Sequence, residues 1–265
     1  MARLIAWLAV ADALALAGSG LVWPYDIHAV NVADRLAPPS FSHPLGTDHL
    51  GRDVLARLRA GGLNLAIVAA AAATVSIAAG AGLGLIAAMS NGWPRTMALR
   101  VADLVQILPH LIMVALFVAV FGLSPLGVGV ALGVAGAGAY ALLVDGLASG
   151  AVRSPHVMAA KAVGAGRWHA LRRHVLPAAL PTVRAYAGSD LGMVASHYAA
   201  LSFIGLGADS APDWGAMIYE YRLYVFERPL LVVAPIVALA IAVGVLHFAL
   251  DPPPSRVTAP SRSPA

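Results

Sequence analysis

AVRSPHVMAAKAVGAGRWHALRRHVLPAALPTVRAY, residues 151–186, is a basic stretch set between strongly apolar parts of the chain. It contains no acidic residue, and its cationic residues are Arg153, Lys161, Arg167, Arg172, Arg173 and Arg184. Ser154-Pro155 predicts a helix start, the glycines of 164–166 predict a break, and Pro177 predicts the stop of a second helix over 167–175. The stretch is therefore predicted to form two short helices and not a membrane span.

The composition places the rest of the chain in a membrane. Hydrophobic residues make up 60% of the 265 residues, charged residues only 11%, and the mean hydropathy is +0.79. These values exclude a soluble globular protein. The sequence has no cysteine, so disulfides and thiolate chemistry are excluded as well.

Six apolar stretches are long enough to cross a bilayer. They cover residues 3–22, 63–89, 98–121, 126–148, 186–206 and 230–250. We therefore expect an all-α integral membrane protein with a first transmembrane helix in 1–22, an extracytoplasmic segment in 23–62 and a transmembrane core in 63–250. The last residues, 251–265, are rich in proline and serine and are expected to be a disordered tail.

The distribution of charge predicts the orientation of these spans. An even number of spans puts both termini on one side, and the side that holds 151–186 has the excess of arginine, while the other side also carries eight acidic residues. The positive-inside rule then predicts cytoplasmic termini. A cleaved signal peptide is the alternative for the first span, but Asp12 interrupts its apolar run and favours a retained helix.

The sequence lacks the motifs of an enzyme. Its single lysine, Lys161, is not part of a phosphate-binding loop, and no zinc-protease or serine-hydrolase motif is present. We expect a non-catalytic chain that binds no cofactor. If ATP powers transport here, another polypeptide binds it.

Three motifs carry a family resemblance. The first is Ala159 to Ala165 followed by His174 to Pro177, the second is HPLGTDHLGRD at 43–53, and the third is LSFIGLG at 201–207 with PDWG at 212–215. Together they resemble permease subunits of binding-protein-dependent ABC importers, in the "C-type" branch that transports dipeptides, oligopeptides and nickel. The first motif is similar to the EAA loop of these permeases, although Met158 stands where that loop has glutamate.

The resemblance implies an ABC importer type I permease fold and a multi-subunit assembly in a bacterial inner membrane. The implied partners are a second, different permease, two ATPase domains that use ATP, and an extracytoplasmic substrate-binding protein. The residues implied to form the ATPase-coupling loop are Ala159, Ala160, Lys161, Gly164, Ala165, Arg167 and Pro177. The alternative is that the cations of 151–186 act only as topogenic signals, but such a loop needs no helical breaks.

The motif at 43–53 has two compatible interpretations. Its glycines suit turns and its carboxylates suit capping, which is a structural role. On the outer side it could also contact the substrate-binding protein. The residues concerned are Gly46, Asp48, Gly51, Arg52 and Asp53.

Ionisable residues inside spans are candidates for the transport path. Asp190 and His197 are two helical turns apart and are predicted to share one face, and Asp103 is a third candidate. A carboxylate and an imidazole suit transient binding of a divalent metal such as nickel, but equally a hydrogen bond within the bundle. The stretch around Asp190 and His197 is similar to nickel-importer permeases, so we expect nickel or a nickel chelate as cargo. A dipeptide or oligopeptide is the alternative, and a secondary transporter is a more remote one.

Overall fold

The computed structural model describes residues 25–122, 124–152, 154–155, 157–158, 166, 169, 171–206 and 212–249. Every long element in this part of the chain is a helix. The α-helices are α2 (Val54–Met89), α3 (Trp93–Ile107), α4 (His110–Phe121), α5 (Pro125–Val152), α8 (Leu176–Leu201), α9 (Trp214–Tyr221) and α10 (Pro229–Ala249). Short turns of 3-10 helix occur at Val32–Asp34 (η2) and Arg222–Tyr224 (η5), and π-helical turns at Leu171–Val175 (η3) and Ser202–Leu206 (η4). The predicted first span and the predicted tail lie outside the described residues.

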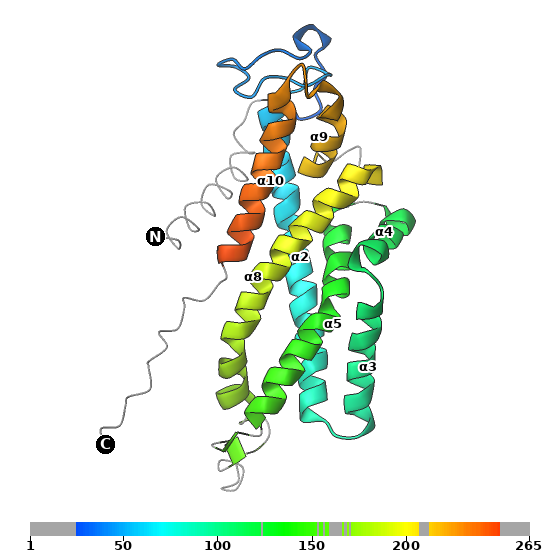
Figure 1. Cartoon of the computed structure of the whole chain (residues 1–265), viewed down its shortest axis with the longest axis vertical. Helices are drawn as coiled ribbons and strands as arrows, with labels where there is room; N and C mark the ends of the chain where they lie inside the picture. Colours follow the sequence, from blue (N-terminus) through cyan, green and yellow to red (C-terminus); the bar gives the residue numbers. More distant parts are fainter. Residues whose placement is uncertain are drawn as a thin grey trace, which may run out of the picture.

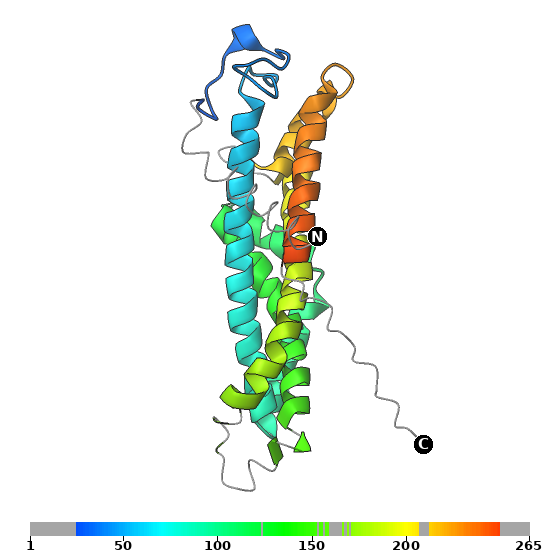
Figure 2. The same ribbon diagram turned by 90° about the vertical axis from the view of Figure 1, so that its left-hand side faces the viewer.

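The helices form one elongated bundle with two distinct ends (Figure 1). The upper end carries residues 25–53 and the turn between α9 and α10, and the lower end carries the turn between α2 and α3 and the last turn of α5. Figure 2 shows α2 running the length of the bundle on one side, with α8 and α10 on the other. Residues 151–152 and 171–175 of the basic stretch therefore lie at the end opposite the motif at 43–53.

The packing of α2 on α5 is the largest helix contact of the bundle. Glycines make this close approach possible: a Cβ atom on Gly80 would lie 2.5 Å from both the Ala137 carbonyl oxygen and the Tyr140 Cβ atom. On α5, a Cβ atom on Gly133 would lie 2.6 Å from the Val75 Cβ atom. The buried core continues from this contact onto α4 and α8.

The helix α2 begins at Val54, well ahead of the predicted residue 63, and has 36 residues. Asp53 caps it, because the Asp53 side chain accepts a 2.6 Å hydrogen bond from the Ala56 amide. At 1.5 Å per residue the helix is about 54 Å long, which exceeds the apolar thickness of a bilayer. Its first turns belong to the upper end of the bundle.

The predicted third span, 98–121, is not one straight helix. It is divided into α3 and α4, which meet at an angle of 82°. The cause is Pro109, because the residue before a proline is driven out of the helical region, and Leu108 is extended with φ −83° and ψ 131°. A prediction based only on the hydropathy averaged over about 20 residues cannot detect this break.

The prediction that Pro177 stops a helix is wrong. Pro177 lies in the first turn of α8, and the π-helical turn η3 leads directly into that helix. Proline is accepted there because the amides of a first helical turn need no partner within the helix. The predicted fifth span, 186–206, accordingly begins ten residues earlier, at Leu176.

Three described helices are long and apolar enough to cross a membrane, namely α2, α5 and α10, and the bent pair of α3 and α4 makes a fourth candidate. The helix α8 is not among them, since polar residues such as Arg184, Asp190 and Ser196 interrupt its apolar surface. The described residues thus hold three or four of the six predicted spans by this criterion.

Candidate functional site

The turn at 46–53 is built around two glycines with a left-handed backbone. Gly46 has φ +76° and Gly51 has φ +74°, and a Cβ atom on Gly51 would lie 1.8 Å from the Asn31 carbonyl oxygen. Only glycine fits these positions without displacing the backbone. An isolated β-bridge from Thr47 to Asp53 closes the turn directly before α2.

Asp48 lies at the centre of this turn and is fully buried. Its Oδ1 atom accepts hydrogen bonds from the amides of Leu50 (2.8 Å) and Arg52 (3.0 Å). Its Oδ2 atom accepts from Arg52 Nε at 2.7 Å and from the Tyr221 hydroxyl at 3.1 Å. One carboxylate therefore joins the turn to the end of α9.

Two arginines extend this network to Glu220 on α9. Arg52 Nη2 and Arg57 Nη2 each donate a hydrogen bond of 2.9 Å to Glu220 Oε2. Arg57 is only 4% exposed, although it stands on the first turns of the apolar helix α2. We call Asp48, Arg52, Arg57, Glu220 and Tyr221 the upper cluster.

His49 adjoins the upper cluster and raises the question of a metal site. Asp48, His49 and Glu220 bring ligand atoms within 4.8 Å of one another. The two arginines already neutralise both carboxylates, however, and a metal ion would have to displace them. Burial lowers the pKa of His49, and burial also raises the pKa of Tyr221. These groups are better suited to joining the 46–53 turn and α2 to α9 than to binding a cation.

Asp190 and His197 lie two helical turns apart on α8, with Asp190 directed at α5 and His197 at α4. The Asp190 Oδ1 atom is 3.8 Å from the position that a Cβ atom on Gly136 of α5 would take. The ring of His197 meets the ring of His110 on α4 edge to face, with 6.2 Å between centroids. His110 is close enough to act electrostatically on both Asp190 and His197.

Sequence reasoning missed His110. It is the first residue of α4, directly after the Pro109 break, and its partner His197 is distant in the sequence. An imidazole next to a helix-breaking proline inside an apolar stretch is the signal that could have found it.

The structure does not bring Asp103 to this group. Asp103 is exposed on α3, a helix that packs on α2 and α5. Another carboxylate within a predicted span, Asp145, has a clear partner: Arg95 donates two hydrogen bonds to it, of 2.7 and 2.8 Å. That pair fixes α3 to α5 near the lower end.

Most of the predicted coupling loop lies outside the described residues. This applies to Ala159, Ala160, Lys161, Gly164, Ala165 and Arg167. Met158, in the position where the resemblance implies glutamate, is 60% exposed. Pro177 is exposed on the first turn of α8.

The long apolar helices, the bent pair of α3 and α4 and the polar residues on α8 are features of a membrane-embedded protein. Residues 80–252 match the family model "Binding-protein-dependent transport system inner membrane component". The chain belongs to this family and is a permease subunit of an ABC importer.

Curated relatives agree with this membership. The chain is 34% identical to the nickel transport system permease protein NikC of Escherichia coli strain K12, over 86% of this chain and 83% of that protein. It is 31% identical to the probable D,D-dipeptide transport system permease protein DdpC of the same strain, over 77% and 69%. It is 33% identical to the glutathione transport system permease protein GsiD of Pectobacterium atrosepticum, over 86% and 75%.

A solved structure shares the fold. The MetNI methionine ABC transporter in inward-facing conformations matches with a TM-score of 0.60 and 18% identity, over 74% of this chain and 93% of that one. The resemblance of the sequence to C-type importer permeases is confirmed by these comparisons, whereas the relatives differ in the cargo that their names give.

Proposed function

We propose that this permease subunit forms half of the translocation pathway for nickel or a nickel chelate. The observation that carries the proposal is the meeting of His110 on α4 with His197 on α8, with ring centroids 6.2 Å apart, while Asp190 lies two helical turns before His197 on α8. Imidazole nitrogen is a preferred ligand of nickel and similar divalent ions, and a carboxylate adds the opposite charge. The relative with nickel in its name is 34% identical over most of both chains.

A dipeptide or oligopeptide is the second candidate cargo. In the part of the chain that the structure describes, Asp190 interacts with the Tyr140 hydroxyl but forms no ion pair with a cationic side chain. A peptide carries a positively charged group at its amino terminus. The similarity to a D,D-dipeptide permease supports this candidate.

Replacing His197 with alanine distinguishes the two. If nickel passes this point, His197→Ala should lower nickel uptake by about tenfold, because one of few ligands is lost, and should leave dipeptide uptake unchanged. The measurement is accumulation of radiolabelled nickel and of a labelled dipeptide in cells that lack this chain and receive it back on a plasmid. Ser196→Ala is the matched control, since Ser196 is exposed and donates to the Gly192 carbonyl of its own helix. Equal loss of both cargoes would return His197 to a structural role.

The proposal includes the assembly. The chain would pair with a different, homologous permease, receive cargo from an extracytoplasmic binding protein, and dock through 151–186 on a separate ATPase, with both termini in the cytoplasm. The position of 151–152 and 171–175 at the end opposite the 43–53 motif supports this arrangement. Affinity purification of the tagged chain should recover an ATPase and a second permease, and a chain that transports when purified alone would favour a secondary transporter.

A further inference from the structure

Three buried oxygen atoms at the junction of α8 and α9 lack hydrogen-bond partners. They are Asp213 Oδ2, Ser202 Oγ and Tyr198 Oη. The three residues are 0%, 1% and 3% exposed, respectively. Buried polar atoms are nearly always partnered in folded proteins, so a group of three that are not indicates a missing occupant.

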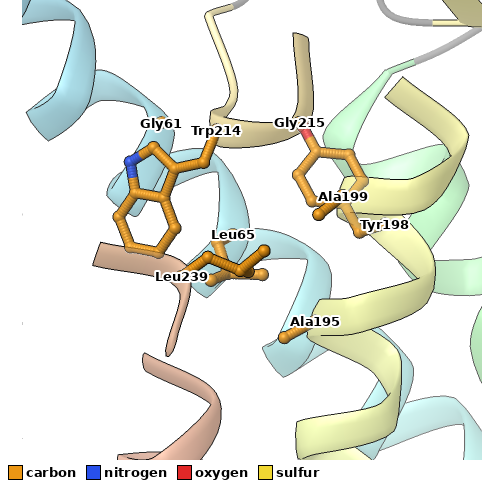
Figure 3. Close-up of a pocket in the computed structure, with 8 residues that line it drawn as sticks. All are labelled: Gly61, Leu65, Ala195, Tyr198, Ala199, Trp214, Gly215 and Leu239. Carbon is orange, nitrogen blue, oxygen red and sulfur yellow. The ribbon is translucent and has the colours of Figure 1, made fainter. Parts of the chain in front are cut away.

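The chain brings these atoms to one place. Tyr198 and Ser202 are one helical turn apart and share a face at the end of α8. The start of α9 is pressed against that turn, because a Cβ atom on Gly215 would lie 2.1 Å from the Ala199 carbonyl oxygen. Asp213 directly precedes α9. Its carboxylate is within hydrogen-bonding reach of the Ser202 hydroxyl, although not at the geometry of a direct bond, and it acts electrostatically on the Tyr198 hydroxyl. Figure 3 shows the Tyr198 hydroxyl directed at Gly215.

Neighbouring donors are already engaged. The Trp214 indole donates to the Leu58 carbonyl at 2.7 Å, and the Asn64 amide donates to the Pro212 carbonyl at 2.8 Å. The other oxygen of Asp213 accepts from the Ala216 amide at 2.9 Å as the cap of α9. Among the described residues, no arginine, lysine or histidine forms an ion pair with Asp213.

We propose that Asp213, Ser202 and Tyr198 form a buried binding site for one monovalent cation of the size of sodium. All three ligand atoms are oxygens, which hard cations prefer. A single buried carboxylate balances a single positive charge. A cavity of about 10 Å³ lined by Tyr198, Trp214 and Gly215 lies on the Tyr198 side of the site and is too small for an organic ligand.

Such an ion would connect α9, which carries part of the upper cluster, to α8, which carries the candidate residues of the transport path. Helix α9 carries Glu220 and Tyr221 of the upper cluster, and α8 carries Asp190 and His197. The cation would join α8 to α9 at their closest approach. Sodium would then stabilise the permease without being transported.

The test is the sodium dependence of stability in the purified, assembled importer. At equal ionic strength, sodium chloride should raise the melting temperature of this subunit by several degrees over N-methylglucamine chloride, in a saturable manner. Asp213→Asn should abolish that rise. Asparagine also caps helices well, so the variant keeps the start of α9 and should still fold. Tyr198→Phe, which removes only the hydroxyl group, should weaken the response.

Asp26→Asn is the control, because Asp26 is an exposed carboxylate that should leave the sodium response intact. Binding of radiolabelled sodium, approaching one ion per chain and lost in Asp213→Asn, would establish the site directly. A melting temperature that is the same in both salts, with no sodium bound, would overturn the proposal and assign a proton or a water molecule to the site. Neither outcome depends on which cargo the importer carries.

Discussion

Replacing Asp48 with alanine is expected to destabilise the upper end of the bundle by about 3–5 kcal/mol, because the buried arginines of the upper cluster lose a paired carboxylate. Asp48 accepts hydrogen bonds from two amides, from Arg52 Nε and from the Tyr221 hydroxyl, and both Asp48 and Tyr221 are fully buried. Glu220 alone cannot compensate for both Arg52 and Arg57. Transport should be lost together with the attachment of residues 25–53 to α9.

The measurement is the melting temperature of the purified variant, combined with limited proteolysis within residues 25–53. Asp26→Ala serves as the control, because that exposed side chain bonds only to the nearby His28 amide. If Asp48→Ala melted like the unaltered chain and resisted protease equally, the upper cluster would not be the element that secures this end.

The second large effect is expected from Gly80→Ala on α2. Alanine is the better helix former by about 1 kcal/mol, so propensity alone predicts a gain in stability. The added methyl group would, however, lie 2.5 Å from the Ala137 carbonyl oxygen and the Tyr140 Cβ atom on α5. Overpacking of this kind costs about 1–3 kcal/mol or more, and here the obstacle is backbone that cannot rotate away.

Gly82→Ala is the matched control, since it lies on the same helix and a Cβ atom there meets nothing within 4 Å. It should melt at the same temperature as the unaltered chain or slightly higher, while Gly80→Ala should melt lower and accumulate less in membranes. Equal melting temperatures for the two variants would mean that α2 and α5 are not packed as described.

Sequence reasoning located the helices well wherever apolar character decides them. The spans predicted at 126–148 and 230–250 correspond closely to α5 and α10. It failed where one residue redirects the backbone: Pro109 splits a span, and Pro177 begins a helix where a stop was predicted. Proline has opposite effects at the first turn and in the interior of a helix, and a hydropathy window contains no information on which applies.

The residues of the candidate site also fall into two groups, those that the sequence predicts and those that it does not. The face shared by Asp190 and His197 follows from helical periodicity, and the structure bears it out. His110, Arg57 and Glu220 were missed because their partners are far away in sequence, with Arg57 and Glu220 separated by 163 positions. Contacts of this range depend on how helices pack, which a single sequence without an alignment does not encode locally.

The length of α2 has a mechanical consequence. A rigid rod of about 54 Å that begins beneath the upper cluster and ends at the lower turn acts as a lever: a tilt of about 5° around its middle moves each tip by about 2 Å in opposite directions. The close contact of Gly80 with α5 lies below that middle, so a tilt about this contact would move the upper tip farther than the lower one. A force on one end of α2 would therefore move the other end in the opposite direction, with no change in the helix itself.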